Sequence, residues 1–305
     1  LDFRARPLRV RDRGACSMEP MKTKKRIDLT ERDRMILQYV AEHGFASARW
    51  IREVFWPGQT NDHHYRRISK LMKDGLIEHL TIDNGKIVGY RLTRKGIRTT
   101  DRLGVLPADQ IGVRANYWTS FGHDNAMQGI GNIFRQNPSV TEYLAEPQAR
   151  RALAIRHRRE ERKDSGYKVP DALFTLETKK GRFRVAVELE LAEKGEAYLR
   201  QILQQLATSN DFDLVFMIIK NAKMSDHYRT VLQQVRATDP YVKIATRDNG
   251  IYFATLDDVT EHRGNARFVG EETQFTFNGL AKSTAQGAGS PTTSPALNGI
   301  QKNST

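Results

Sequence analysis

Residues 185–191 have the sequence VAVELEL, in which aliphatic residues occupy every second position. This period of two predicts a β-strand with four aliphatic side chains on one face and Glu188 and Glu190 on the other. The two carboxylates would lie roughly 7 Å apart and repel each other by roughly 2 kcal/mol at an effective dielectric constant of about 20. Water, a basic partner or a metal ion must therefore accompany this face of the strand.

The residues around this strand, from 116 to 270, alternate between strand and helix patterns. Short apolar runs predict strands at 168–177, 182–191, 212–220, 241–246 and 250–256. Amphipathic patterns predict helices at 121–136, 193–209 and 224–237. Such alternation is typical of a domain built on a mixed α/β sheet, which we expect over residues 116–270.

Residues 29–104 form another patterned region, which precedes the sheet. Helices are predicted at 29–44, 47–56 and 60–75 from their N-caps, their terminal glycines and their apolar spacing. The side chains of the third helix that we expect to point inward are Tyr65, Ile68, Leu71 and Met72. A β-hairpin that turns at Asp83-Asn84-Gly85 follows, and then a short helix at 92–104. This order predicts an α+β winged helix-turn-helix domain.

The third helix of such a domain lies in the major groove of DNA, and the hairpin wing touches the flanking backbone. Candidate DNA contacts on the helix are its polar and basic residues: Asn61, His63, His64, Arg66, Arg67, Lys70 and Lys73. Lys86 and Arg91 are the candidates on the wing. The alternative is that the charged face of this helix contacts only water and no DNA. The run His63-His64-Tyr65 does not predict a DNA-nicking site, because adjacent histidines on a helix diverge by about 100°.

The chain carries a formal net charge of +13, which favours a polyanionic partner such as nucleic acid. Its one cysteine, Cys16, excludes an internal disulfide and a zinc site with several thiolates. The longest apolar run, 214–219, is too short to cross a bilayer, and no secretory signal is visible, so we expect a cytoplasmic protein without a membrane partner. The compositions of residues 1–28 and 278–305 predict a disordered basic arm and a disordered tail.

The segment Pro170-Asp171-Ala172, followed by a strand with Glu188-Leu189-Glu190 and a helix, resembles the core of PD-(D/E)XK nucleases. In those restriction-endonuclease-like enzymes, an Asp and a Glu hold Mg²⁺, and a lysine two residues after the Glu orients the attacking water. The resemblance implies an Mg²⁺ site at Asp171, Glu188 and Glu190. Glu190 stands where the lysine is expected, and Lys194 is the nearest candidate for a relocated lysine.

Two other interpretations of this region remain open. In a non-catalytic domain, Glu188 and Glu190 face solvent or pair with the arginine-rich segment 150–163. The region can also be an unrelated α/β fold. We interpret His123-Asp124 as the cap of the helix that begins there.

The winged helix, His123-Asp124, Pro170-Asp171 and Val187-Glu188-Leu189-Glu190 together resemble the replication-relaxation family of plasmids and mobile elements. This resemblance implies a regulator or accessory in replication, relaxation or transfer, with relaxase or replication proteins as partners. We expect a homodimer that binds double-stranded DNA sequence-specifically. The alternative is a Mg²⁺-dependent DNA endonuclease that uses Asp171, Glu188, Glu190 and Lys194.

Overall fold

The computed structural model of the chain describes residues 28–59, 63–81, 85–108, 111, 120–159, 168–239, 250–270 and 273–280. Nearly all of the expected basic arm and tail lie outside this range, as do Asn61, two of the three hairpin-turn residues and the strand expected at 241–246. Residues 278–280 are an exception, because they belong to a short helix rather than to the tail. Within the described ranges, no helix is long and apolar enough to cross a membrane.

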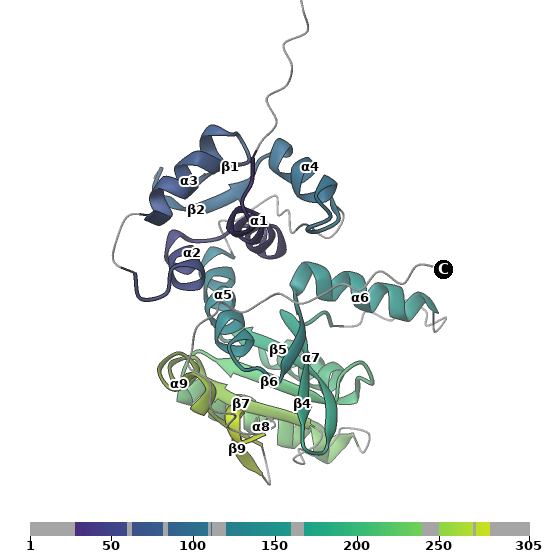
Figure 1. The fold of residues 1–305 in the computed structure, drawn as a ribbon. Coiled ribbons are helices and arrows are strands. Elements are labelled where there is room, and N and C mark those ends of the chain that lie inside the picture. The colour runs from purple at the N-terminus through teal and green to yellow at the C-terminus, as the bar shows by residue number, and fades with distance from the viewer. Residues whose placement is uncertain are drawn as a thin grey trace, which may run out of the picture.

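The N-terminal part of the chain consists of helices and a two-stranded hairpin, in the order expected from the sequence (Figure 1). Its elements are α1 (Glu31–His43), α2 (Ala48–Phe55), α3 (His63–Lys73), β1 (Ile77–Thr81), β2 (Ile87–Leu92) and α4 (Arg94–Arg102). α1 begins with a capping box between Thr30 and Asp33 and ends at Gly44, which has a φ of 78°. An apolar cluster joins the helices to the hairpin: Ile36, Val40, Ile51, Leu71, Leu76 and Tyr90. The predicted elements of this part are therefore confirmed.

The C-terminal part is built on a mixed sheet, whose described strands follow the order β3-β4-β5-β6-β7-β8-β9. Their bounds are β3 (Val140–Ala145), β4 (Ala172–Thr178), β5 (Gly181–Glu190), β6 (Leu214–Ile219), β7 (Gly250–Thr255), β8 (Arg267–Val269) and β9 (Gln274–Thr276). β5, β6 and β7 run parallel to one another, and the other neighbouring pairs are antiparallel. The chain thus has α+β structure with a mixed sheet, as expected.

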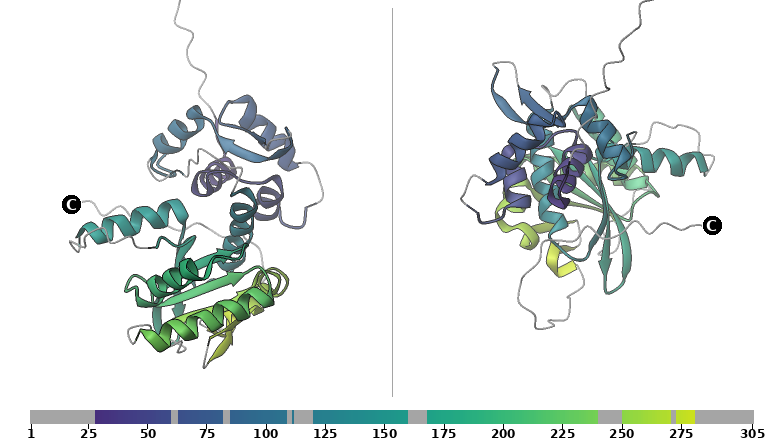
Figure 2. Two further views of the ribbon diagram at one scale, coloured as in Figure 1. Left: turned by 180° about the vertical axis from the view of Figure 1, so that it is seen from behind. Right: turned by 45° about the horizontal axis from the view of Figure 1, so that its top comes forward.

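Helices cover both faces of this sheet (Figures 1 and 2). One face carries α5 (Phe121–Arg135), α9 (Leu256–His262) and α10 (Phe277–Leu280), with the short 3₁₀ helix η2 (Arg263–Asn265) beside them. The other face carries α7 (Glu196–Thr208) and α8 (Ala222–Thr238). α6 (Glu146–Arg159) packs at the β3 side of the sheet. In β5, Val185, Val187 and Leu189 pack toward α5 and Ala186 toward α7, so the alternation predicted for VAVELEL is confirmed.

α5 joins the two parts of the chain, because it lies between the sheet and the N-terminal helices (Figure 1). The indole nitrogen of Trp50 in α2 donates a 2.9 Å hydrogen bond to the backbone oxygen of Asn125 in α5. The guanidinium of Arg135, at the end of α5, lies 2.8 Å from a carboxylate oxygen of Glu42 in α1. Gly129 lets the Trp50 ring approach α5, since a Cβ at Gly129 would lie 2.5 Å from that ring. The junction is therefore closely packed.

Candidate functional site

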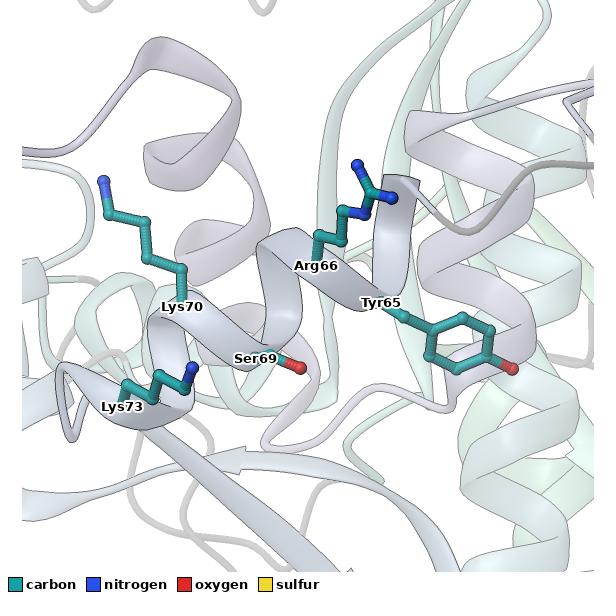
Figure 3. Close-up of a pocket in the computed structure, with 5 residues that line it drawn as sticks. All are labelled: Tyr65, Arg66, Ser69, Lys70 and Lys73. Carbon is teal, nitrogen blue, oxygen red and sulfur yellow. The ribbon is translucent and has the colours of Figure 1, made fainter.

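The outer face of α3 is basic and bordered by a groove. The groove has a volume of about 680 Å³, and its lining residues are Tyr65, Arg66, Ser69, Lys70 and Lys73 (Figure 3). Arg66, Lys70 and Lys73 stand at helical spacing i, i+4 and i+7, which places them along one side of the helix. No carboxylate belongs to the described lining of this groove. The face therefore presents cations, a hydroxyl and a phenol to whatever lies against it.

Two neighbouring residues of α3 have exchanged the places expected for them. Tyr65 was expected inside, but it is 50% exposed and lines the groove. His64 was expected among the DNA contacts, but it is buried, and its ring lies 6.2 Å from the ring of Trp56. The buried row of α3 runs through His64, Ile68 and Leu71 at spacing i, i+4 and i+7. His63 lies on the exposed side, as expected.

Arg67 also differs from the expectation of a DNA contact. Its guanidinium bonds both carboxylate oxygens of Asp33, and it donates a 2.6 Å hydrogen bond to the hydroxyl of Thr30. Asp33 is fully buried, so this ion pair holds α3 against the start of α1. Lys70 lies partly over the same junction, because its ammonium donates a 3.0 Å hydrogen bond to the backbone oxygen of Asp28. Arg66 and Lys73 remain the most exposed cations of the groove.

The β1–β2 hairpin contributes less charge than expected. Lys86 is exposed, and the neighbouring Ile87 is 52% exposed. Arg91 lies 2.8 Å from Glu78 on the opposite strand, so its charge is largely matched within the hairpin. Lys86 and Ile87 are therefore exposed side chains of the described hairpin.

A second candidate site lies where β4 begins and β5 ends. Ala172 pairs with Val187 across the two strands, which puts the preceding Asp171 beside Glu188. Asp171 is fixed there, because it accepts a 2.8 Å hydrogen bond from the backbone nitrogen of Leu189. Glu188 is 1% exposed and Glu190 is 6% exposed. The structure thus gathers the three carboxylates selected from the sequence, but it buries both glutamates rather than exposing them to solvent.

Each of the three carboxylates has its own cation. Nε2 of His123 lies 3.1 Å from Asp171, Nζ of Lys168 lies 2.7 Å from Glu188, and Nζ of Lys194 lies 3.3 Å from Glu190. Lys168 was missed in the sequence, although it stands only three residues before Asp171. Lys194 was expected near this site as a relocated catalytic lysine, and its ammonium instead pairs with Glu190.

His123 and Asp124 do not cap α5, as had been expected from the sequence. The N-cap residue of α5 is Ser120, whose hydroxyl donates a 2.9 Å hydrogen bond to Asp124. The imidazole of His123 lies between Asp124, at 3.3 Å, and Asp171, at 3.1 Å. His123 therefore ties the start of α5 to the start of β4.

The arginine-rich segment does not pair with Glu188 or Glu190 at its described positions. It forms most of α6, in which His157 and Arg156 lie 2.8 Å and 3.6 Å from carboxylate oxygens of Asp211. Basic partners do neutralise Glu188 and Glu190, as one interpretation of the sequence required, but they are Lys168 and Lys194.

In this cluster, burial and the charges of neighbouring side chains shift pKa values in opposite directions. Burial alone would lower the pKa of His123, but hydrogen bonds to Asp124 and Asp171 outweigh it and raise that pKa to about 10. Burial also opposes the charge of Lys168, yet Glu188 and Asp171 raise the pKa of its ammonium. Burial and the charge of Asp171 raise the pKa of Glu188, and the ammonium of Lys168 acts in the opposite direction. The ionised form of Glu188 therefore depends on a cation beside it.

The described residues do not fit the Mg²⁺ site that the nuclease resemblance implies. Among them, no group of three or more His, Cys, Asp and Glu side chains is arranged to hold a metal ion. The carboxylates of Asp171, Glu188 and Glu190 are each engaged by a protonated side chain instead. In this arrangement the cluster is a set of ion pairs between side chains of the chain itself.

Comparisons of the chain with protein-family models, with curated proteins and with solved structures found no match. Function is therefore inferred from the chemistry of the two sites, since a fold alone does not specify one. The basic groove on α3 and the ion-pair cluster at β5 differ in kind. The groove is open and lined by cations, and in the cluster the carboxylates are buried or partly buried beside cations.

Proposed function

We propose that the chain binds double-stranded DNA, with residues 29–104 as a winged helix-turn-helix domain and α3 as the helix in the major groove. The observation that carries this proposal is the groove on α3, which three cations line without a carboxylate among its described residues. Helices of this width fit the major groove of B-form DNA, where arginine bonds guanine edges and lysine bonds phosphates. The net charge of +13 supports the same class of partner.

The individual residues of the groove suit different parts of DNA. Arg66, in the first turns of α3, has the planar donor group that bonds the edge of a guanine. Lys73, in the last turn, presents a compact charge suited to a phosphate. Ser69 lies between the cations and Tyr65 at the end of the row beyond Arg66, and both offer hydroxyl groups to phosphates or base edges (Figure 3). In this proposal Lys86 and Ile87 of the hairpin contact the flanking backbone.

The proposal includes sequence-specific binding by a homodimer that acts as regulator or accessory of a plasmid or mobile element. This context, with relaxase or replication proteins as partners, rests only on the sequence resemblance. The alternative function, a Mg²⁺-dependent endonuclease, has less support. Its expected ligands Asp171, Glu188 and Glu190 are paired with His123 and two lysines.

Selection of duplexes from a random pool with the full chain tests the proposal, because the target sequence is not needed in advance. We expect a common duplex sequence to be enriched. Arg66→Ala should weaken binding to that duplex by about 1–3 kcal/mol, which is about 5-fold to 150-fold in Kd. Arg229→Ala, which removes the same charge from α8 on the sheet, is the matched control and should leave the Kd unchanged. No enrichment, or equal losses in both variants, would overturn the proposal.

A further inference from the structure

We propose that the outer side of α4 is a second DNA-contact surface, which binds the phosphate backbone of the duplex beyond the segment that lies against α3. We call this surface the α4 stripe, and it consists of Arg94, Lys95, Arg98 and Arg102. The inference rests on the proposed function, because the duplex that α3 binds is the one that the stripe follows. Its contacts are to phosphates and add affinity without reading the base sequence.

The four cations of the stripe lie together on the exposed side of α4. Arg94, Arg98 and Arg102 follow one another at a spacing of four residues, and Lys95 lies beside them. All four side chains are exposed, whereas Gly96 on the opposite side of the helix is buried. From Lys95 to Arg102 the helix rises by about 10 Å, which corresponds to about three phosphates of one DNA strand. The stripe therefore has the length of a short run of phosphates.

The charge of the stripe is not balanced by carboxylates in the described part of the chain. None of its three arginines forms an ion pair with a residue in the described ranges. α4 contains one acid, Asp101, which accepts a 3.1 Å hydrogen bond from the backbone nitrogen of Ala108 in the segment after the helix. The helix thus presents an excess of positive charge to whatever lies against its outer side.

The placement of these charges does not serve the stability of α4 itself. Arg94 and Lys95 occupy its first turn, which contains no acid, although the helix dipole makes cations unfavourable there. Like charges four residues apart also destabilise a helix, and Arg98 has such a neighbour on each side. A polyanion along the outer side of α4 would relieve both effects. The arrangement therefore favours a phosphate backbone as the partner of this surface.

The α4 stripe begins where the groove on α3 ends. The ammonium of Lys95 donates a 2.5 Å hydrogen bond to the backbone oxygen of Asp74, which follows Lys73 at the end of α3. A Cβ at Gly96 would lie 2.0 Å from the backbone oxygen of Leu76, so α4 packs directly on the segment after α3. Both helices lie at the end of the molecule that is away from the mixed sheet (Figure 1). A duplex against α3 would therefore meet the stripe beyond the Lys73 end of the groove.

Binding of the full chain to duplexes of two lengths tests this inference. The short duplex ends at the edges of the enriched sequence, and the long duplex extends it by about 10 base pairs on each side. On the long duplex, Arg98→Gln/Arg102→Gln should reduce the slope of log K against log salt by about 2, because two phosphate contacts are lost. On the short duplex the reduction should stay below about 0.5. The control Lys179→Gln/Lys180→Gln removes two exposed charges from the turn between β4 and β5 and should leave both slopes unchanged.

Arg66→Ala, measured on the same two duplexes, separates this inference from the proposed function. If Arg66→Ala weakens binding to both duplexes and Arg98→Gln/Arg102→Gln changes neither slope, the inference is wrong and the proposed function stands. Equal reductions of the slope on the short and the long duplex would also overturn the inference, because the stripe would then contact the same segment as α3. If neither variant affects binding to either duplex, the proposed function fails together with the inference. Circular dichroism of each variant verifies that its helices are intact.

Discussion

The guanidinium of Arg67 in α3 bonds both carboxylate oxygens of Asp33, which forms the capping box at the start of α1 with the N-cap residue Thr30. Asp33 is fully buried, whereas the side chain of Arg67 is 26% exposed. The ion pair therefore closes the contact between two helices that are more than thirty residues apart in sequence.

Arg67→Ala should lower the free energy of unfolding by about 2–3 kcal/mol, because it leaves the buried carboxylate of Asp33 without its cation. Urea unfolding followed by circular dichroism measures this loss. The neighbouring Arg66→Ala removes the same charge from the exposed side of α3 and should change stability by at most about 0.5 kcal/mol. Equal stabilities for the two variants would contradict the assigned role of Arg67.

The positions of His64 and Tyr65 give a second prediction. His64→Ala should cost about 2 kcal/mol of stability, since it removes a buried ring that lies beside Trp56. Tyr65→Ala, at a half-exposed position, should cost at most about 0.5 kcal/mol. Thermal unfolding of the two variants, side by side, checks the difference. The reverse order of stabilities would mean that α3 is rotated by one residue from the orientation described.

Gly129 gives a third prediction, at the junction between α5 and α2. Gly129→Ala should destabilise the chain by about 1–3 kcal/mol, because its Cβ would lie 2.5 Å from the Trp50 ring. Alanine normally stabilises a helix relative to glycine, so a loss here has a specific cause. Gly122→Ala in the same helix meets nothing within 4 Å and is the control. Chemical denaturation should show no loss for Gly122→Ala, and a gain for Gly129→Ala would refute the close contact.

His43 predicts a pH dependence of stability. Burial and the nearby charge of Arg135 lower the pKa of His43 well below its ordinary value. The unfolded chain takes up a proton at this residue below a pH of about 6.5, while the folded chain does not. The full free energy of unfolding is therefore present above a pH of about 6.5. It decreases as the pH falls further, because protonation of His43 then favours the unfolded chain.

His43→Gln removes the titrating group and should reduce the loss of stability between neutral pH and pH 5. The exposed His227 of α8 is the control, and His227→Gln should leave the pH profile unchanged. Urea unfolding at a series of pH values provides the comparison. A profile for His43→Gln that is parallel to that of the unaltered chain would show that His43 titrates normally.

Local patterns were sufficient to predict most of the elements. Thr30 and Gly44 mark the ends of α1, and the alternation at 185–191 marks β5, because caps and side-chain periods depend on the nearest residues alone. β3 was missed, since its pairing with β4 is irregular near Glu142, which has a φ of 53°. Such an irregular edge strand lacks the regular alternation of apolar and polar residues from which strands are predicted.

The contacts that define the sites were harder to predict. Ile68 belongs equally to a buried row with Tyr65 and to one with His64, so spacing alone did not fix the rotation of α3. The pair of Arg67 and Asp33 spans 34 residues, and the pair of Lys168 and Glu188 spans 20. Sequence periodicity carries no information about partners at such separations, which depend on how the elements pack.

The dependence of DNA affinity on salt tests most directly whether α3 binds DNA. Binding of a duplex to the full chain, to Lys73→Ala and to Lys223→Ala would be measured over a range of salt concentrations by fluorescence anisotropy. Lys73 lines the groove, and Lys223 is an exposed lysine of α8 on the sheet. We predict that Lys73→Ala reduces the slope of log K against log salt by about 1, because one phosphate contact is lost, and that Lys223→Ala leaves it unchanged. Identical slopes for Lys73→Ala and the unaltered chain would contradict a DNA-binding role for this face.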